Sequence, residues 1–234
     1  ERTAIMVAHW MRVGFVHGVM NTDNMSILGL TIDYGPYGWV DNFDPDWTPN
    51  TTDAQHRRYR FGHQPQIAQW NLSRLASALL SLFPSPEPLE AALEHYATVY
   101  TRTQEALTAG KFGLKSWRDT DEDWVAEAMR LLRDAEMDMT IFFRALAEVP
   151  PDRPTIEPLL ESFYREDLRD RHAAAIGEWL VRYAARIRED QEPEALRRER
   201  LMRDRALTAE QATAMIRSQM PSELKRARAD YVIE

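Results

Sequence analysis

Two short polar segments near the start of the chain carry the residue types that phosphate chemistry needs. Asp23 and Asn24 are adjacent, and Asp33 follows an apolar run and precedes Tyr34 and Gly35. Carboxylate and amide oxygens suit Mg²⁺ or Mn²⁺, which keep water ligands and share phosphate oxygens with a substrate. A further carboxylate can accept the proton of an attacking hydroxyl. The pattern predicts a metal-assisted phosphoryl-type transfer site.

The apolar run between these segments must bring them together. Met25 to Ile32 is bounded by Asn24 and Asp33 and contains Gly29, a pattern that predicts a strand or a small hairpin. Because a hairpin brings its two ends together, we expect Asp23, Asn24 and Asp33 to converge on one point.

The rest of the chain is predicted to be helical. Residues 5–16 have a broad apolar helical pattern, and a helix there is expected to end near His17 and Gly18. The prolines, aromatics and Asn/Asp clusters of residues 39–63 indicate a long ordered loop. Further helices are expected at residues 64–80, 89–107, 121–146, 156–164 and 169–188, followed by a charged segment at 196–234 with short amphipathic stretches. The predicted fold class is mainly α with a small β-hairpin.

Composition excludes several classes of function. The formal net charge of −8 argues against wrapping a nucleic-acid backbone, which needs clustered Lys and Arg. Cysteine is absent, which excludes disulfides and thiolate metal sites within the chain, and no apolar run approaches the length of a membrane span. Lys111 is the first lysine, so a nucleotide site built by the first hundred residues must take its lysine from elsewhere.

Longer motifs resemble one known family. Asp33-Tyr34-Gly35 resembles the metal-binding turn of protein kinases, although the kinase base and Asn are not adjacent as Asp23 and Asn24 are. The whole run from His17 to Gly38 resembles the signature of the selenoprotein O family. Arg60-Phe61-Gly62-His63-Gln64-Pro65 and Trp70-Asn71-Leu72-Ser73-Arg74-Leu75 resemble that family too.

This resemblance implies a pseudokinase-type, kinase-like fold, of which this chain would supply the C-terminal lobe. It implies a protein adenylyltransferase that binds ATP in a flipped orientation and transfers AMP to Ser, Thr or Tyr hydroxyls of protein substrates. By motif position, Asp23 would be the catalytic base. Asn24 and Asp33 would hold Mg²⁺ or Mn²⁺, and Asp33 would contact the nucleotide through the cation.

The chain also departs from the family pattern. The glycine-rich loop, phosphate-binding Lys and nucleotide-binding arginines of the N-terminal lobe are not visible, and neither is the family's C-terminal cysteine or selenocysteine. We therefore expect a fragment that is inactive alone, with a catalytic segment at residues 1–80, a helical region at 81–234, and the N-terminal lobe as a required partner. A cytoplasmic location is expected if the source is bacterial.

Two other functions remain open from the residues. The same site would serve a conventional kinase that transfers the γ-phosphate, and the segment alone would serve as an inert helical scaffold. Outside the site, His17 is expected to be structural, and Arg57, Arg58 and Arg60 are expected to be solvated or paired with carboxylates rather than to bind phosphate.

Overall fold

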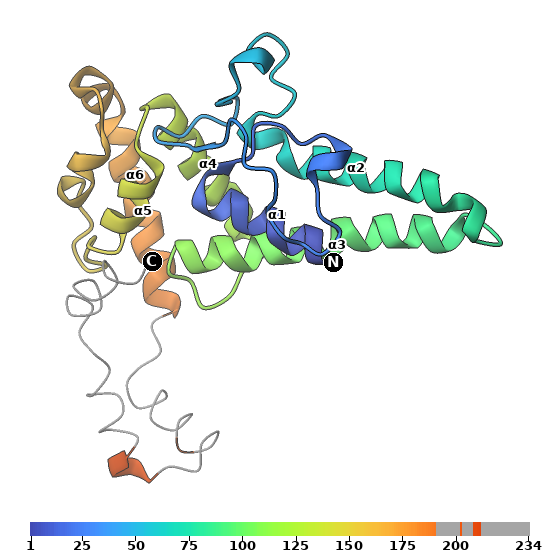
Figure 1. Ribbon diagram of the computed structural model, residues 1–234. Helices are drawn as coiled ribbons and strands as arrows, with labels where there is room; N and C mark the ends of the chain where they lie inside the picture. The colour runs from blue at the N-terminus through green and yellow to red at the C-terminus, as the bar shows by residue number, and fades with distance from the viewer. Residues whose placement is uncertain (191–201, 203–207, 212–234) are drawn as a thin grey trace. The chain divides into compact units, whose positions relative to one another are not determined.

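The computed structural model describes residues 1–190, Met202 and residues 208–211 (Figure 1). Residues 1–187 form one compact unit, and the architecture described below belongs to it. The second unit begins at Arg188, and the charged segment predicted at residues 196–234 lies almost entirely outside the described residues.

The described chain is mainly helical, as predicted. Its helices are α1 (Arg2–Val13), α2 (Gln64–Leu79), α3 (Glu87–Lys111), α4 (Asp121–Asp134), α5 (Met139–Leu146) and α6 (Glu166–Asp190). Short 3₁₀ turns are η1 (Thr22–Asn24), η2 (Thr51–Asp53), η3 (Phe61–His63), η4 (Leu80–Leu82) and η5 (Glu157–Ser162). Strands β1 (Phe15–Val16) and β2 (Gly38–Trp39) pair antiparallel, with Phe15 opposite Trp39. A search of the described helices finds none that is long and apolar enough to cross a bilayer.

The predicted hairpin at residues 25–32 is wrong. That run contains a turn, in which the Gly29 amide donates to Ser26 O at 3.3 Å, and no strand. Its apolar side chains are largely exposed, Ile27 at 68% and Leu30 at 57%, so a buried face that would fix a strand register is missing. The pairing instead joins β1 and β2, which bracket the whole segment from His17 to Tyr37.

The end of α1 also differs from the prediction. Gly14, not Gly18, terminates the helix: it adopts a left-handed φ of 73° and its amide reaches back to Met11 O and Trp10 O. Gly14 O then accepts the Val40 amide at 2.8 Å, which carries the chain directly into the sheet. A glycine stop signal was therefore correctly expected but placed one glycine too late.

Three of the later helices match the prediction and two need correction. α2, α3 and α6 confirm the helices expected at residues 64–80, 89–107 and 169–188. The single helix expected at 121–146 is two helices, because Glu136 takes a positive φ of 49° and Asp138 caps α5 by accepting the Ile141 amide at 2.8 Å. The segment expected to be helical at 156–164 contains only the 3₁₀ turn η5.

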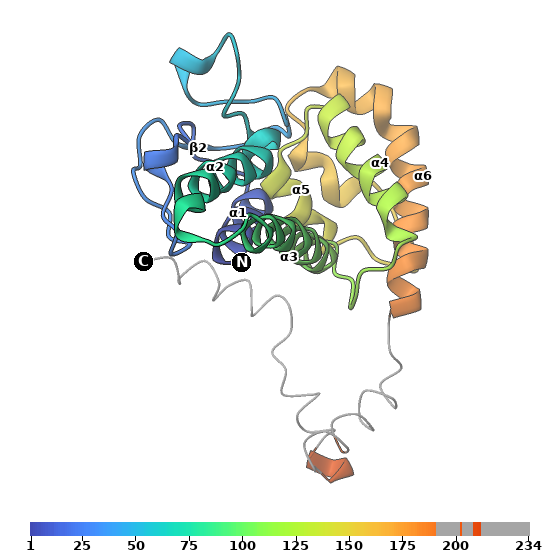
Figure 2. The ribbon, with the colours of Figure 1, turned by 90° about the vertical axis from the view of Figure 1, so that its right-hand side faces the viewer.

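Helices α2 and α3 form a helical hairpin, and α1 lies along α3 (Figures 1 and 2). One apolar core joins Val7 and Trp10 of α1 to Ile67 of α2 and Tyr96 of α3, and it includes Met20 from the polar loop. A second core surrounds Trp179 of α6. The first core therefore anchors the segment that carries the predicted site.

A buried ion pair fixes α6 against α4. Arg186 Nε donates to Asp121 Oδ1 at 2.8 Å, and their side chains are 8% and 1% exposed. Burial disfavours the charged carboxylate, but hydrogen bonds from Arg186, Trp124 and the Arg118 amide outweigh it and hold the pKa of Asp121 below its usual range.

Candidate active site

Asp23 and Asn24 lie on the 3₁₀ turn η1, at the end of the polar loop that follows β1. The side chain of Asp23 is exposed. Asn24 Nδ2 donates to Val19 O at 3.1 Å, which orients the amide and leaves its oxygen, Oδ1, as the atom that a cation can use. The loop thus presents one carboxylate and one amide oxygen side by side in the sequence.

Asp33 lies at the start of a second turn and has an unusual backbone conformation. Its φ of 56° is in the left-handed region, which Asp tolerates better than most residues. Gly35 N donates to Asp33 O at 2.8 Å, closing a tight turn in which the Asp33 side chain is exposed. Positive φ at a non-glycine residue costs free energy and is often found at functional sites.

Side chains of His17 and Trp10 join this turn to the polar loop and to α1. His17 Nε2 lies 2.8 Å from Ile32 O, directly before Asp33, and must donate because a carbonyl only accepts. Gly18, with a φ of 82°, lies so close to the turn that a Cβ there would be 2.3 Å from Pro36 O. Trp10 Nε1 donates to Thr31 Oγ1 at 2.9 Å, which ties the same turn to α1.

Buried side chains from α2 and the long loop hold the polar loop residue by residue. Gln64 is fully buried; its Oε1 accepts the His17 amide at 2.9 Å, and its Nε2 donates to Phe15 O at 2.8 Å. Asn50 Nδ2 donates to Gly18 O at 3.0 Å, and Asn71 Nδ2 donates to Met20 O at 3.0 Å. The loop backbone is therefore fixed by amide side chains 32 to 51 positions away in the sequence.

Sequence reasoning missed these supporting residues. Gln64 and Asn71 stand inside the two later motifs, and Asn50 stands in the long loop, but nothing in their local pattern marks them as buried. The only available signal was a polar residue on an otherwise apolar helix stripe. His17, by contrast, is structural as expected: it is 1% exposed, and its ring bonds the carbonyl before Asp33.

The donor set fits a hard divalent cation with few protein ligands. Among the described residues, no three His, Cys, Asp or Glu side chains converge where they could hold a metal. No hydrogen bond joins the side chains of Asp23, Asn24 and Asp33 in this part of the chain, so their oxygens are available. An amide oxygen from Asn24 and a carboxylate from Asp33 would give a cation two protein ligands, which matches the way Mg²⁺ keeps water and phosphate oxygens.

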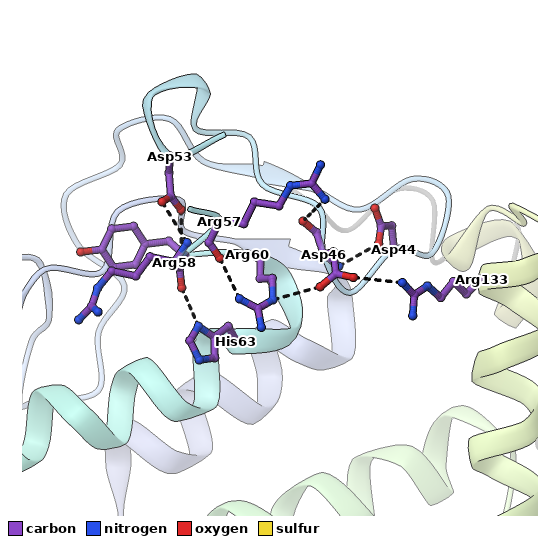
Figure 3. Close-up of polar contacts among 9 residues, drawn as sticks. Asp44, Asp46, Asp53, Arg57, Arg58, Arg60, His63 and Arg133 are labelled. Atoms are coloured by element: carbon purple, nitrogen blue, oxygen red, sulfur yellow. Dashed lines mark hydrogen bonds and ion pairs between the residues drawn. The ribbon is translucent and has the colours of Figure 1, made fainter. Parts of the chain in front are cut away.

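The arginines of the long loop divide into two groups (Figure 3). Arg60 Nε lies 3.1 Å from Asp46 Oδ1, Arg133 lies 3.0 Å from Asp46 Oδ2, and Arg57 donates to the Asp46 carbonyl at 3.4 Å. Two of the three arginines singled out from the sequence are thus engaged with Asp46. Arg58 is different, because its guanidinium points away from this network.

Comparison with known proteins identifies the family to which the chain belongs. Residues 1–226 match the family model described as protein adenylyltransferase SelO, so the chain belongs to the SelO family and the resemblance seen in its motifs is confirmed.

Similar proteins include two that are described as protein nucleotidyltransferase YdiU. The protein nucleotidyltransferase YdiU of Xanthomonas axonopodis pv. citri (strain 306) is 59% identical over 201 residues, which are 86% of this chain and 39% of that protein. That of Xanthomonas oryzae pv. oryzae (strain MAFF 311018) is 58% identical over 190 residues, 81% of this chain and 37% of that protein. The chain therefore spans about two fifths of the length of these relatives.

Proposed function

We propose that the protein is an ATP-dependent protein adenylyltransferase in which residues 1–80 supply the catalytic segment of a kinase-like C-terminal lobe. Asp23 is the catalytic base, and Asn24 and Asp33 hold Mg²⁺ or Mn²⁺. The acceptors are Ser, Thr or Tyr hydroxyls of protein substrates. Membership of the SelO family supports nucleotide transfer.

One observation carries the assignment of residues. The hydrogen bond from His17 Nε2 to Ile32 O joins the loop that carries Asp23 to the turn that carries Asp33. Without that hydrogen bond, the two acidic segments would be separate exposed turns. With it, and with Gly18 close to Pro36, the start of the polar loop is attached to the turn that carries Asp33.

The chemistry follows from this arrangement. The Asp23 carboxylate accepts the proton of the acceptor hydroxyl and orients its oxygen toward the α-phosphorus of ATP. A bond forms between that oxygen and the α-phosphorus, the bond from the α-phosphorus to the bridging oxygen breaks, and pyrophosphate leaves. A bound cation supplies neutralisation of the phosphate charge.

The rest of the protein would complete this site. The apolar run beyond Asn24 is exposed, and the aromatic rings that follow it are exposed as well, Tyr34 at 61% and Trp39 at 53%. The ring of Tyr37 packs between them, with its centroid 5.4 Å from that of Tyr34 and 5.5 Å from that of Trp39. Such a surface is large for a folded protein to leave in water. We assign it as the face that the N-terminal lobe covers, and the isolated chain is then inactive.

The test uses the protein at the length of its relatives, with Mg²⁺ and ATP labelled at either the α- or the γ-phosphate. Retention of the α-label on protein, and its loss in Asp33→Asn, is the expected result. Asp152→Asn is the matched control, because Asp152 is an exposed turn residue outside the site.

Other outcomes would reassign the function. Retention of only the γ-label would identify a conventional kinase. Retention of neither label, in a protein that keeps its circular-dichroism spectrum and binds no Mg²⁺-ATP, would favour the scaffold function.

A further inference from the structure

Beside the polar loop, two arginines flank an exposed tryptophan. The guanidinium carbon of Arg58 lies 4.7 Å from the centroid of the Trp70 ring, and that of Arg74 lies 5.4 Å from the same ring. Both distances are within the range of cation–π contacts. Trp70 is 44% exposed on α2, so this basic-aromatic surface, defined by Arg58, Trp70 and Arg74, faces solvent.

The backbone of Arg58 is fixed, whereas its charge is not neutralised. Asp53 is buried, and its carboxylate accepts hydrogen bonds from two backbone amides, Arg58 N at 3.0 Å and Tyr59 N at 2.7 Å. His63 Nδ1 bonds Arg58 O at 2.9 Å. Neither Arg58 nor Arg74 pairs with a carboxylate of the described residues, in contrast to the arginines that hold Asp46 (Figure 3).

This surface adjoins the candidate active site. Tyr59, next to Arg58, donates from its hydroxyl to Asn21 Oδ1 at 2.5 Å, two residues before Asp23. Asn71, next to Trp70, holds the carbonyl of Met20. The basic-aromatic surface is therefore rigidly attached to the loop that carries the proposed base.

A cavity of about 270 Å³ opens between Arg74 and the same loop. Its walls include Leu72 and Leu75, and Thr22 contributes from the turn η1. Asn71 also lines it, is 6% exposed, and has an Oδ1 atom without a hydrogen-bond partner in the described part of the chain. A buried acceptor of this kind is normally satisfied by a hydrogen bond.

We propose that this surface binds an acidic polypeptide segment and so selects protein substrates with Glu or Asp near the acceptor hydroxyl. The methylenes of a glutamate fit the Leu72 and Leu75 walls while its carboxylate reaches Arg74, and a second carboxylate pairs with Arg58. The chain has a formal net charge of −8, so an acidic partner needs such a local positive surface. The same net charge disfavours a nucleic acid. The role of this surface in selecting substrates rests on the proposed function, but peptide binding itself does not require AMP transfer.

The test measures peptide binding without nucleotide, by fluorescence anisotropy with the protein at the length of its relatives. Two labelled peptides share one serine and differ only in flanking Glu or Gln. We expect the Glu peptide to bind about 3–10-fold more tightly at low salt, because two exposed charge pairs contribute modestly. The preference should disappear in Arg58→Gln/Arg74→Gln and persist in Arg57→Gln, whose guanidinium contacts Asp46 instead.

Equal binding of the two peptides, an equal loss in Arg57→Gln, or displacement of the peptide by a thymidine oligonucleotide as effectively as by unlabelled peptide would each overturn the proposal. AMP transfer is scored separately with α-labelled ATP. A protein that transfers AMP but shows no acidic preference refutes only the docking surface. A protein that keeps the preference but transfers no AMP supports the surface and refutes the proposed function.

Discussion

Replacing Gln64 by methionine tests whether the polar loop is held from outside. Gln64 is fully buried and makes two hydrogen bonds to the backbone at the start of the loop, one to the His17 amide and one to Phe15 O. Methionine has a similar length and no amide, so Gln64→Met removes both bonds while filling most of the volume. The His17 N–H and the Phe15 carbonyl are then left without a partner in a dry site.

The expected cost follows from these two groups. A buried donor or acceptor that loses its partner costs about 1–3 kcal/mol. The two bonds share one side chain, so their costs do not simply add, and we expect Gln64→Met to lower the free energy of unfolding by about 2–4 kcal/mol. With a urea slope of about 2 kcal/mol per M, the unfolding midpoint should fall by roughly 1–2 M.

Urea unfolding of the 234-residue chain, with hydrogen exchange read at the His17 amide, measures both the global and the local effect. Gln66→Met is the matched control, because Gln66 is exposed on the same helix and should change stability by about 0.5 kcal/mol or less. Gln64→Glu keeps an acceptor for His17 but turns a carboxylate oxygen toward Phe15 O. It should therefore be destabilised near neutral pH and recover as the pH falls and the carboxyl gains a proton. A Gln64→Met protein with the midpoint and exchange rate of the wild type would refute the reasoning.

Three further perturbations test the elements around the site. Gly18→Ala combines a positive φ with a Cβ 2.3 Å from a carbonyl oxygen, and it should lower the free energy of unfolding by more than about 1 kcal/mol. Gly177→Ala within α6, where a Cβ meets nothing within 4 Å, should raise the free energy of unfolding by about 0.5–1 kcal/mol. The urea unfolding midpoints of the two variants measure both effects. Arg186→Met, which strands the buried carboxylate of Asp121, should cost about 3–5 kcal/mol. Because the pKa of Asp121 is lowered in the fold, the stability from this pair is present above about pH 3.9 and is lost as the pH falls through the pKa of the folded state. Melting temperatures of the wild type measured from pH 7 to pH 2 should show this loss. Burial, and then the charge of Arg12 on α1, lower the pKa of Lys111 to about 8. The unfolded chain therefore binds more protons than the folded one between about pH 8 and pH 10, and the free energy of unfolding should rise with pH across that window. Lys111→Met should abolish this rise and add about 1–2 kcal/mol of stability at pH 7, and an unchanged pH dependence in the variant would contradict the prediction.

Local patterns in the sequence were sufficient for the helices that bury one face. The stripes of α2 and α3 follow the helical period, and their bounds lie within a few residues of those predicted. The same reasoning failed for residues 25–32, because an apolar run indicates burial without saying what covers it. In the structure, Gly29 of this run lies against Arg2 at the start of α1, and most of the run's apolar side chains stay exposed.

The predicted proximity of Asp23 and Asp33 depended on that incorrect hairpin and stays a prediction, although the start of the polar loop and the residue before Asp33 are tied together. The reason is long-range: β1 pairs with β2 across the whole segment, and His17 bonds the carbonyl before Asp33. Neither contact has a local sequence pattern, because each joins residues that only the tertiary fold brings together. Whether the three side chains act as predicted stays a prediction for the labelling experiment.

The described residues divide the work of the site between buried amides and exposed carboxylates. Gln64, Asn50 and Asn71 are buried and spend their hydrogen bonds on the backbone, so the loop keeps its shape without help from Asp23 or Asp33. Replacing an exposed carboxylate whose side chain makes no hydrogen bond within the described residues should cost little stability. Asp33→Asn should cost least of all, because asparagine tolerates the left-handed φ of 56° that alanine would strain. Loss of transfer in Asp33→Asn, with an unchanged melting temperature, would therefore report on chemistry rather than on folding.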